Sequence, residues 1–308
     1  MLAFGMLAQR YRETLAGRPA FINYSQIHKQ YFLPWEPLPL DQITKPMIRA
    51  WHLQHKEAPS HANKGLSYLK GVYNFAINAG AWDQANPVDG IKKHAEYSRD
   101  RVLIQQELQL LLFGIECLEP KRRAYLTLLL TTACRRGEAC KMEWAHVDLK
   151  IGRWWKGKTK NGRGQWIPLP SQTRAALDAL PRTGRYVFAG DPNGEKQYWS
   201  ESSAEKFWGD LRSKCALVNV TIHDIRRTVA SRIYAQERDW HLVQAVLNHY
   251  DGSPTAIYVR LNYDLIAQVL QKHADNLWAL ALPGPTDYAE PLTPLRETGA
   301  LPFAEGLA

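Results

Sequence analysis

The sequence predicts a mainly α-helical protein that carries a small β-sheet and is built from two domains. Over most of the chain, apolar residues recur at helical spacing, as in Leu66, Leu69 and Tyr73. Residues 147–170 break this pattern, because two short apolar or aromatic runs flank a turn rich in Gly, Asn and Lys, which is typical of a β-hairpin. The length of 308 residues fits two domains of ordinary size.

The first domain is predicted to cover residues 1–90 and to be entirely helical. Asp41 and Thr44 are candidate N-caps of one helix, because short polar side chains accept hydrogen bonds from unpaired N–H groups at a helix start. Ser60 is the candidate N-cap of a longer helix, which Gly80 ends.

Helical periodicity is lost after this helix, where Pro, Gly and charged residues accumulate, and residues 91–101 are predicted to form an interdomain linker. The second domain is predicted over residues 102–281, with helices on both sides of the hairpin. Residues 282–308 are rich in Pro, Gly and Thr and slightly acidic, so we expect a flexible C-terminal tail.

The charge balance points to a polyanionic partner. The formal net charge is +9 and the isoelectric point is about 9.3. A surplus of Lys and Arg favours nucleic acid over a membrane surface. The N-terminal residues have no basic segment leading into a long apolar run, and apolar stretches fall short of about 18 residues. We therefore expect neither a signal peptide nor a membrane span.

The four cysteines are too few for a disulfide scaffold, and none forms a Cys-x-x-Cys pair. They are Cys117, Cys134, Cys140 and Cys215. Cys134 and Cys140 lie in an apolar helical run and are predicted to be buried core residues. This usage fits a reducing compartment, so we expect a cytoplasmic protein.

Four segments of the second domain combine residues that can handle a phosphate. They contain Arg135 and Glu138 in TTACRRGEAC, a cationic hairpin tip with Lys156, Lys158, Lys160 and Arg163, His223 and Arg226 in HDIRR, and His249 followed by Tyr258 in LNHYDGSPTAIYVR. Taken singly, each has an ordinary explanation: a surface ion pair, a solvated turn, a capped helix, or packing. Taken together, they describe one site.

The chemistry of such a site follows from the side chains. Two guanidiniums can grip one phosphate and neutralise the charge that develops on its oxygens in a transition state. A lysine can deliver a proton to a leaving oxygen, and a histidine can accept one. A tyrosine hydroxyl is a weak nucleophile, because its pKa is about 10, but surrounding cations favour the phenolate.

In this order, the segments resemble the catalytic domain of tyrosine recombinases, specifically the phage-type integrases. The family pattern of Arg, Lys, His-x-x-Arg, His or Trp, and Tyr is matched by Arg135, Lys160, His223, Arg226, His249 and Tyr258, with Glu138 at the family's acidic position. There are two departures: Ala133 stands where the family usually has Gly, and LNH replaces the commoner LGH. The stretch VYNFAINAGAWDQANPVDGIKK is similar to the end of the family's helical core-binding domain, and the resemblance implies a C-shaped clamp around DNA.

The resemblance also implies a role for each residue. Tyr258 is the nucleophile that forms a 3′-phosphotyrosyl bond with DNA. Arg135 and Arg226 hold the phosphate, Lys160 is the general acid and His223 the base. His249 hydrogen-bonds a non-bridging oxygen, and Glu138 orients Arg135 or its neighbours as a supporting group. No cofactor and no metal ion are implied.

Further expectations concern partners. The hairpin around Lys160 is expected to enter the minor groove of double-stranded DNA. The candidate DNA contacts are Lys64, Lys70, Lys158 and Arg163. Family members act as homotetramers, and the amphipathic segment 265–281 is a candidate for packing on a neighbouring subunit, with an intramolecular helix as the alternative. A DNA-bending accessory protein and a monomer in free solution are left open. Arg227 is unassigned, with a DNA-backbone contact and an interdomain ion pair both open.

Three other functions compete with a recombinase that integrates or excises a mobile element. A type IB topoisomerase-like enzyme uses the same chemistry without strand exchange. A DNA-binding protein that has lost catalysis would keep the fold alone. A metal-dependent nuclease would use His223, Asp224 and His249, although their spacing lacks a compact ligand motif.

Overall fold

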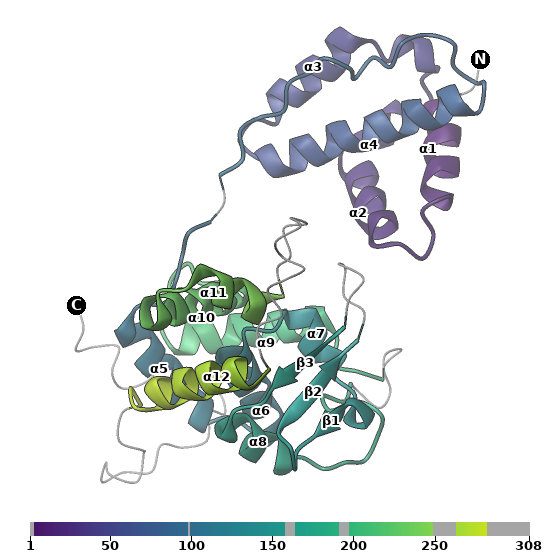
Figure 1. The fold of residues 1–308 in the computed structure, drawn as a ribbon. Helices are drawn as coiled ribbons and strands as arrows, with labels where there is room; N and C mark the ends of the chain where they lie inside the picture. The colour runs from purple at the N-terminus through teal and green to yellow at the C-terminus, as the bar shows by residue number, and fades with distance from the viewer. Residues whose placement is uncertain (1–2, 98, 158–163, 191–196, 249–262, 282–308) are drawn as a thin grey trace. The chain divides into compact units, whose positions relative to one another are not determined.

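The computed structural model describes residues 3–97, 99–157, 164–190, 197–248 and 263–281 (Figure 1). The chain divides into two compact units between Arg99 and Asp100, a point inside the predicted linker. Both units are mainly helical, and the described residues contain one small antiparallel sheet, so the predicted fold class is confirmed. Residues Met1–Arg99 form unit 1, and residues Asp100–Ala308 form unit 2.

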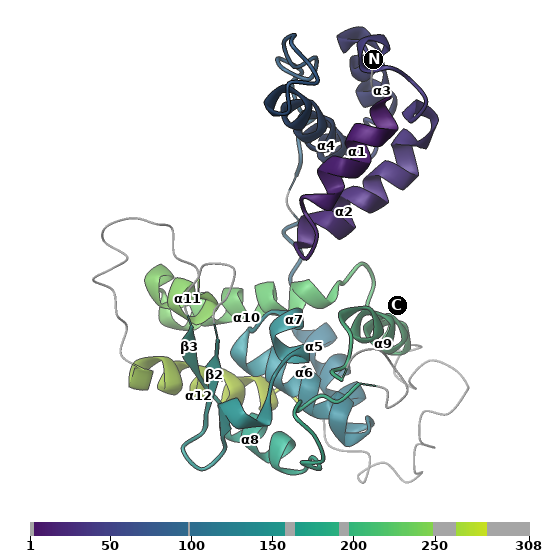
Figure 2. The same ribbon diagram turned by 90° about the vertical axis from the view of Figure 1, so that its right-hand side faces the viewer.

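Unit 1 is a helical unit arranged around one long helix. Its α-helices are α1 (Phe4–Glu13), α2 (Pro19–Ile27), α3 (Lys45–Gln54) and α4 (Pro59–Asn78), with a π-turn at His28–Phe32 and short 3₁₀ turns at Leu33–Trp35 and Leu40–Gln42. Helix α4 contacts α1, α2 and α3 (Figure 2). The core is rich in aromatic rings, among them Phe4, Phe32 and Tyr68, each fully buried.

Local signals set the ends of these helices. The hydroxyl of Thr44, rather than Asp41, caps α3 by accepting the Met47 N–H at 3.4 Å. The prediction that Ser60 caps α4 is wrong, because the helix begins at Pro59, whose fixed φ and missing N–H suit a first helical turn. Gly80, with φ +67°, follows the end of α4 in the left-handed conformation that glycine tolerates.

The first part of the predicted linker is attached to unit 1 by Asn63 on α4. The Asn63 amide donates to the His94 carbonyl at 2.9 Å, and its oxygen accepts the His94 N–H at 2.9 Å. The His94 ring stacks on His52, with centroids 3.8 Å apart. These contacts fix the chain beyond α4, so unit 1 extends past the predicted limit of residue 90.

Unit 2 packs a small sheet against a group of helices (Figure 1). Its α-helices are α5 (Gln105–Glu116), α6 (Pro120–Thr132), α7 (Arg136–Cys140), α8 (Ser171–Asp178), α9 (Glu201–Lys214), α10 (Ile222–Glu237), α11 (Trp240–Leu247) and α12 (Tyr263–Trp278), with a 3₁₀ turn at Trp144–His146. The strands are β1 (Val147–Asp148), β2 (Arg153–Lys156) and β3 (Gln165–Pro168). They form an antiparallel sheet in the order β1-β2-β3.

The predicted hairpin is confirmed as β2 and β3. Trp154 pairs with Ile167, and Lys156 with Gln165, across the two strands. Because side chains alternate between the faces of a strand, Trp154 and Lys156 share the inward face of β2. Both are buried, at 3% and 5% exposed. A lysine therefore occupies a position that strand alternation usually gives to an apolar residue.

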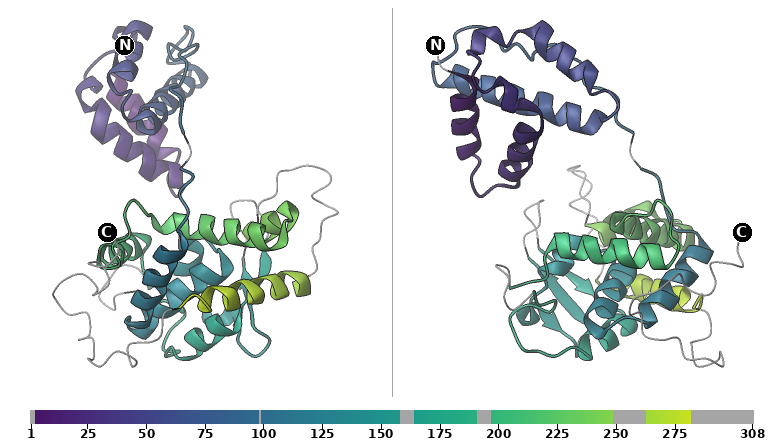
Figure 3. Two further views of the ribbon diagram at one scale, coloured as in Figure 1. Left: turned by 90° about the vertical axis from the view of Figure 1, so that its left-hand side faces the viewer. Right: turned by 180° about the vertical axis from the view of Figure 1, so that it is seen from behind.

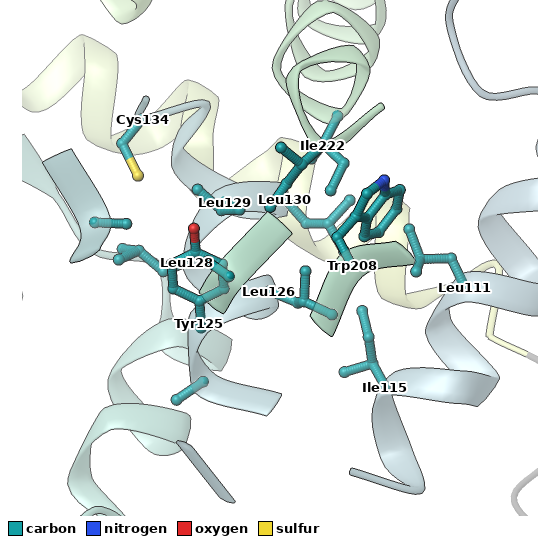
Figure 4. Close-up of a cluster of buried hydrophobic side chains, with 14 of the residues drawn as sticks. Leu111, Ile115, Tyr125, Leu126, Leu128, Leu129, Leu130, Cys134, Trp208 and Ile222 are labelled. Carbon is teal, nitrogen blue, oxygen red and sulfur yellow. The ribbon is translucent and has the colours of Figure 1, made fainter. Parts of the chain in front are cut away.

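Helix α6 is the centre of unit 2. Every residue from Ala124 to Thr132 is buried, and α6 contacts α5, α8, α10 and α12. Its leucines pack with Leu111 and Ile115 of α5, Trp208 of α9 and Ile222 of α10 (Figure 4). A helix that is apolar on all sides must be covered on all sides, and its C-terminal end is consequently held in a fixed place.

Helix α12 packs inside its own unit, beside α6, α10 and α11 (Figure 3). Leu270 and Leu277 on its apolar face are 1% and 0% exposed. The expectation that this segment packs on a neighbouring subunit is therefore wrong for its apolar face, and the intramolecular alternative holds. His273, fully buried on the same helix, hydrogen-bonds the Leu130 carbonyl through Nε2 at 2.9 Å.

No helix within the described residues is both long and apolar enough to cross a membrane.

Burial of His273 predicts an acid-sensitive contribution to stability. Burial lowers the pKa of His273 to about 4. A histidine with a depressed folded pKa stabilises the protein fully above its unfolded pKa of about 6.5, and this contribution is lost as the pH falls towards 4. Between pH 7.5 and pH 5, wild type should lose about 2 kcal/mol more unfolding free energy than His273→Gln, which keeps an amide donor for Leu130 but does not titrate. Urea unfolding measures this, and parallel pH profiles would contradict it.

Candidate active site

The first part of the site is the turn between α6 and α7. Ala133 ends α6 in the left-handed conformation, with φ 53°. Arg135 then occupies the N-cap of α7, and the Glu138 carboxylate accepts both the Arg135 backbone N–H at 2.9 Å and its Nη1 at 3.0 Å. The predicted Arg135–Glu138 pair is thus a helix-capping pair, which fixes the arginine at the start of the helix.

Lys156 of β2 completes this ion cluster. Its Nζ lies 3.2 Å from Glu138 Oε2. Burial opposes ionisation of Glu138, but Lys156 and Arg135 outweigh it and lower the pKa of the carboxyl group. Burial also lowers the pKa of Lys156, against the pull of Glu138. One carboxylate is therefore shared by two cations at the joint of the sheet and α7.

Arg226 of α10 is buried behind this cluster, at 6% exposed. Its Nη2 donates to the Leu247 carbonyl at 2.6 Å, and its Nη1 donates to the Ala133 carbonyl. Burial, with the nearby charge of Arg135, lowers the pKa of Arg226 to about 10. The guanidinium remains charged at neutral pH and links three segments: the ends of α6 and α11, and the first turns of α10.

His223 lies on the first turn of α10, where Asp224 organises the helix start. Asp224 is fully buried and accepts the Thr221 N–H and hydroxyl, both at 2.8 Å, while Arg227 Nη1 donates to it at 2.7 Å. The unassigned Arg227 is therefore an intrahelical partner of Asp224. Burial, with Arg227 and Arg226, lowers the pKa of His223, so a neutral ring that can accept a proton is favoured at pH 7.

These residues meet at one cleft of about 740 Å³. Arg135, Glu138, Lys156 and His223 all line it. Its other lining residues include the cations Arg136 and Lys141, the rings of His146, Trp154 and Trp155, and Glu201. Arg226 does not line the cleft, but its charge acts on Arg135 and His223, and its hydrogen bonds hold the backbone at Ala133 and Leu247. The cleft is open and lined by several cations, which suits an anionic group of a large substrate.

A sequence model of the phage integrase family matches residues 101–264, which is more than half of the chain. The chain belongs to the phage integrase family. The predicted resemblance is thereby confirmed, and the matched region contains the whole cleft. The tyrosine recombinase XerC of Pseudomonas putida is 25% identical over 273 residues, covering 85% of this chain and 87% of that protein.

Solved integrase structures share the fold of this family member. A lambda integrase tetramer bound to a Holliday junction matches with a TM-score of 0.66 and 20% identity, over 82% of this chain and 79% of that one. The Tn1549 transposon integrase in complex with circular intermediate DNA matches with a TM-score of 0.63 and 17% identity, over 87% and 98%. Because the sequence identities are this low, the structural similarity shows a shared fold.

The predicted site residues of unit 2 fall into two groups. Arg135, Glu138 and His223 are brought together at the cleft, and Arg226 lies within the electrostatic influence of Arg135 and Glu138. Five further residues lie outside the described residues: Lys158, Lys160, Arg163, His249 and Tyr258.

The two candidate DNA contacts of unit 1 differ in their surroundings. Both Lys64 and Lys70 are exposed on α4. Lys70 Nζ forms an ion pair with Asp89 at 2.7 Å, which offsets part of its charge. Lys64 forms no ion pair within 4.0 Å with any other described residue. Its charge acts on Glu96 only as one of several contributions that lower the pKa of that carboxyl group. Lys64 is therefore the better candidate for a phosphate contact.

Sequence reasoning missed two features of the site. It counted Lys156 among the cations of the hairpin tip, whereas Lys156 faces inward and pairs with Glu138. Strand alternation from Trp154 could have revealed this, because positions two apart share a face. It also gave no role to Arg136, which pairs with Glu201 and Glu205 and so attaches α7 to α9.

Two of the three residues proposed for a metal-dependent nuclease, His223 and Asp224, lie within the described residues, and His249 does not. Asp224 is fully buried, and both of its oxygens are engaged by Thr221 and Arg227. In the part of the chain that the structure describes, no three His, Cys, Asp or Glu side chains are grouped to hold a metal ion.

Arg226 should be more sensitive to conservative replacement than its neighbour Arg227. A lysine at position 226 cannot donate in fork geometry to the two carbonyls of Ala133 and Leu247, so Arg226→Lys should lower the unfolding free energy by about 1–3 kcal/mol. Arg227→Lys, the matched control, keeps one donor for Asp224 and should cost clearly less, about 0–1 kcal/mol. Chemical denaturation of both variants measures the difference, and equal losses would refute a bridging role for Arg226.

Proposed function

We propose that this protein is a tyrosine site-specific recombinase that cleaves and rejoins duplex DNA through a 3′-phosphotyrosyl intermediate. The observation that carries the proposal is the meeting of Arg135, Glu138 and His223 in one cationic cleft, inside the region that matches the phage integrase family. A relative of this chain is named as a tyrosine recombinase, and the similar solved structures are integrases bound to DNA.

In the cleavage step, the Tyr258 oxygen forms a bond to the scissile phosphorus as the bond to the 5′-oxygen breaks. His223 takes the phenolic proton, which fits a ring whose pKa is lowered by burial and by two arginines. Lys160 gives a proton to the leaving 5′-oxygen. Arg135 stabilises the charge on the phosphate oxygens, and Arg226 adds positive charge from behind it.

In the second step, a 5′-hydroxyl of a partner strand attacks the phosphotyrosine and releases Tyr258. One phosphodiester replaces another, so neither a nucleotide cofactor nor a net input of energy is required. His249 donates a hydrogen bond to a non-bridging oxygen in both steps, and Glu138 holds Arg135 in place. Strand exchange, rather than simple relaxation, separates this proposal from a topoisomerase-like enzyme.

The synaptic assembly follows from the same reaction. Exchange between two DNA sites needs two cleaved strands from each, so we propose a homotetramer on paired sites, as in the lambda integrase structure on a Holliday junction. Because the apolar face of α12 is covered within unit 2, contacts between subunits must use other surfaces. Integration or excision of a mobile element is the proposed outcome, consistent with the transposon integrase among the similar structures.

The nucleophile can be tested on nicked duplexes cut from the DNA that flanks the gene. In excess chelator, wild type should form a covalent protein–DNA band on a denaturing gel, because a cleaved strand loses its short fragment and cannot rejoin. Tyr258→Phe should form none, since the attacking oxygen is gone. The matched control Tyr263→Phe removes a hydroxyl that, within the described part of the chain, donates to the Gly152 carbonyl at 3.4 Å, and it should still cleave.

Two outcomes would contradict this assignment. A covalent band that persists in Tyr258→Phe would place the nucleophile elsewhere. Tight binding to a flanking duplex without any covalent band from wild type would favour a DNA-binding protein that has lost catalysis.

The two lysines of α4 give a test of DNA contact in unit 1. Each phosphate contact that is lost reduces the slope of log K against log salt by about 0.9. Lys64→Ala should lower that slope by about 1, whereas Lys70→Ala, which also frees Asp89 from its ion pair, should change it less. Filter binding or fluorescence anisotropy at several salt concentrations measures both slopes. Equal slopes for wild type and Lys64→Ala would remove Lys64 from the interface.

A further inference from the structure

Lys156 is an unusual feature of the cleft, because an ammonium group is buried on the inward face of a strand. Only 5% of the residue is exposed, yet it lines the cleft beside Arg135 and Glu138. Its backbone is fixed by the pairing with Gln165 on β3, and its Nζ reaches Glu138 Oε2 at 3.2 Å. A buried charge is costly unless it is paired, so the position of this lysine is set by Glu138.

The two oxygens of Glu138 are divided among three donors. Oε2 accepts the Arg135 backbone N–H at 2.9 Å and Lys156 Nζ at 3.2 Å. Oε1 accepts Nη1 of the Arg135 side chain at 3.0 Å. A guanidinium and a carboxylate tend to form two parallel hydrogen bonds. Here the second oxygen is already occupied, so the Arg135 side chain is held by one nitrogen.

We propose that Lys156 is a positioning residue for Arg135. By occupying Oε2 of Glu138, it prevents a two-pronged Arg135–Glu138 pair and leaves the other N–H groups of the guanidinium for the scissile phosphate. The inference rests on the proposed function, since it assigns Arg135 to a DNA phosphate. It also gives β2 a second role, because the strand that leads to Lys160 then tethers the carboxylate that orients Arg135.

The role follows from charge as well as geometry. The negative charge of Glu138 is shared between Lys156 and Arg135. Less of the positive charge of Arg135 is therefore neutralised within the protein. Without Lys156, Arg135 alone balances the carboxylate. The guanidinium would then turn towards Glu138 and away from the phosphate, and transition-state stabilisation would fall while DNA binding over the remaining surface would persist.

The first measurement is the single-turnover cleavage rate of full-length protein on a nicked duplex at saturating enzyme. Lys156→Met keeps the length of the side chain and removes its charge. It should slow cleavage about 10–100-fold with DNA affinity changed less than about 2-fold, because the interaction acts in the transition state. Lys150→Met, the same substitution at an exposed turn outside the cleft, should cleave at the wild-type rate.

Coupling to Glu138 is the decisive comparison. If Lys156 acts only through the Glu138 charge, then Lys156→Met should have little further effect once Glu138→Gln has removed that charge. The double variant should cleave within about 3-fold of Glu138→Gln alone. A double variant more than about 10-fold slower would overturn the proposal. The double variant leaves neither Lys156 nor Glu138 as an unpaired buried charge, so the comparison does not require Lys156→Met alone to fold.

A second substrate separates positioning from proton donation. A duplex with sulfur in place of the bridging 5′-oxygen has a leaving group that needs no proton. The defect of Lys156→Met should stay the same on this duplex, because the phosphate still needs Arg135. Full rescue by the sulfur would make Lys156 the general acid and overturn the positioning role.

Failure of the proposed function looks different from failure of this inference. If wild type forms no covalent complex on any flanking duplex, the recombinase assignment fails and the inference falls with it. If wild type cleaves and Lys156→Met cleaves at the same rate, the recombinase assignment stands and the positioning role alone is refuted.

Discussion

The site depends on one buried guanidinium. Arg226 donates to the carbonyls of Ala133 and Leu247, which lie at the C-terminal ends of α6 and α11. Helix C-termini carry partial negative charge and unpaired carbonyl groups, so two of them compensate a cation that has little contact with water. Because Arg135 follows Ala133 closely and His223 precedes Arg226 by less than one turn, this interaction sets the distance between Arg135, the proposed phosphate ligand, and His223, the proposed proton acceptor.

The two residues that depart from the family pattern, Ala133 and Asn248, lie at or next to the carbonyl groups that accept hydrogen bonds from Arg226. Ala133 and Asn248 both cap their helices in the left-handed conformation, with φ 53° and φ 51°. Glycine reaches this conformation without a steric penalty, which accounts for its usual presence at both positions. Asparagine tolerates it nearly as well, whereas alanine costs about 1 kcal/mol or more. The buried contacts of Ala133, which is 0% exposed in the α10–α11–α12 core cluster, offset that cost, so the carbonyl still points at Arg226.

The sequence predicted those parts of the site that depend on local spacing. Arg135 and Glu138 lie one helical turn apart, as do His223 and Arg226. In the structure Arg135 hydrogen-bonds Glu138, and the charge of Arg226 acts on His223. The role of Lys156 could not be predicted in this way, because it depends on the approach of β2 to α7, two elements that only the tertiary fold brings together. The apolar face of α12 was equally visible in the sequence, but periodicity shows only that a face is buried and not which surface covers it.

The arrangement of carboxylates explains why the cleft stays cationic. Arg136 is balanced by Glu201 and Glu205, and Arg227 by Asp224, so these cations are matched within the protein. Arg135 and Lys156 instead both pair with the one carboxylate of Glu138. In a partly buried site, where solvent screens charge weakly, this excess attracts an anion strongly. Complete neutralisation would make the empty site more stable and the transition state less so. The unequal pairing therefore leaves unmatched positive charge at the place where the proposed phosphate would bind and neutralise it.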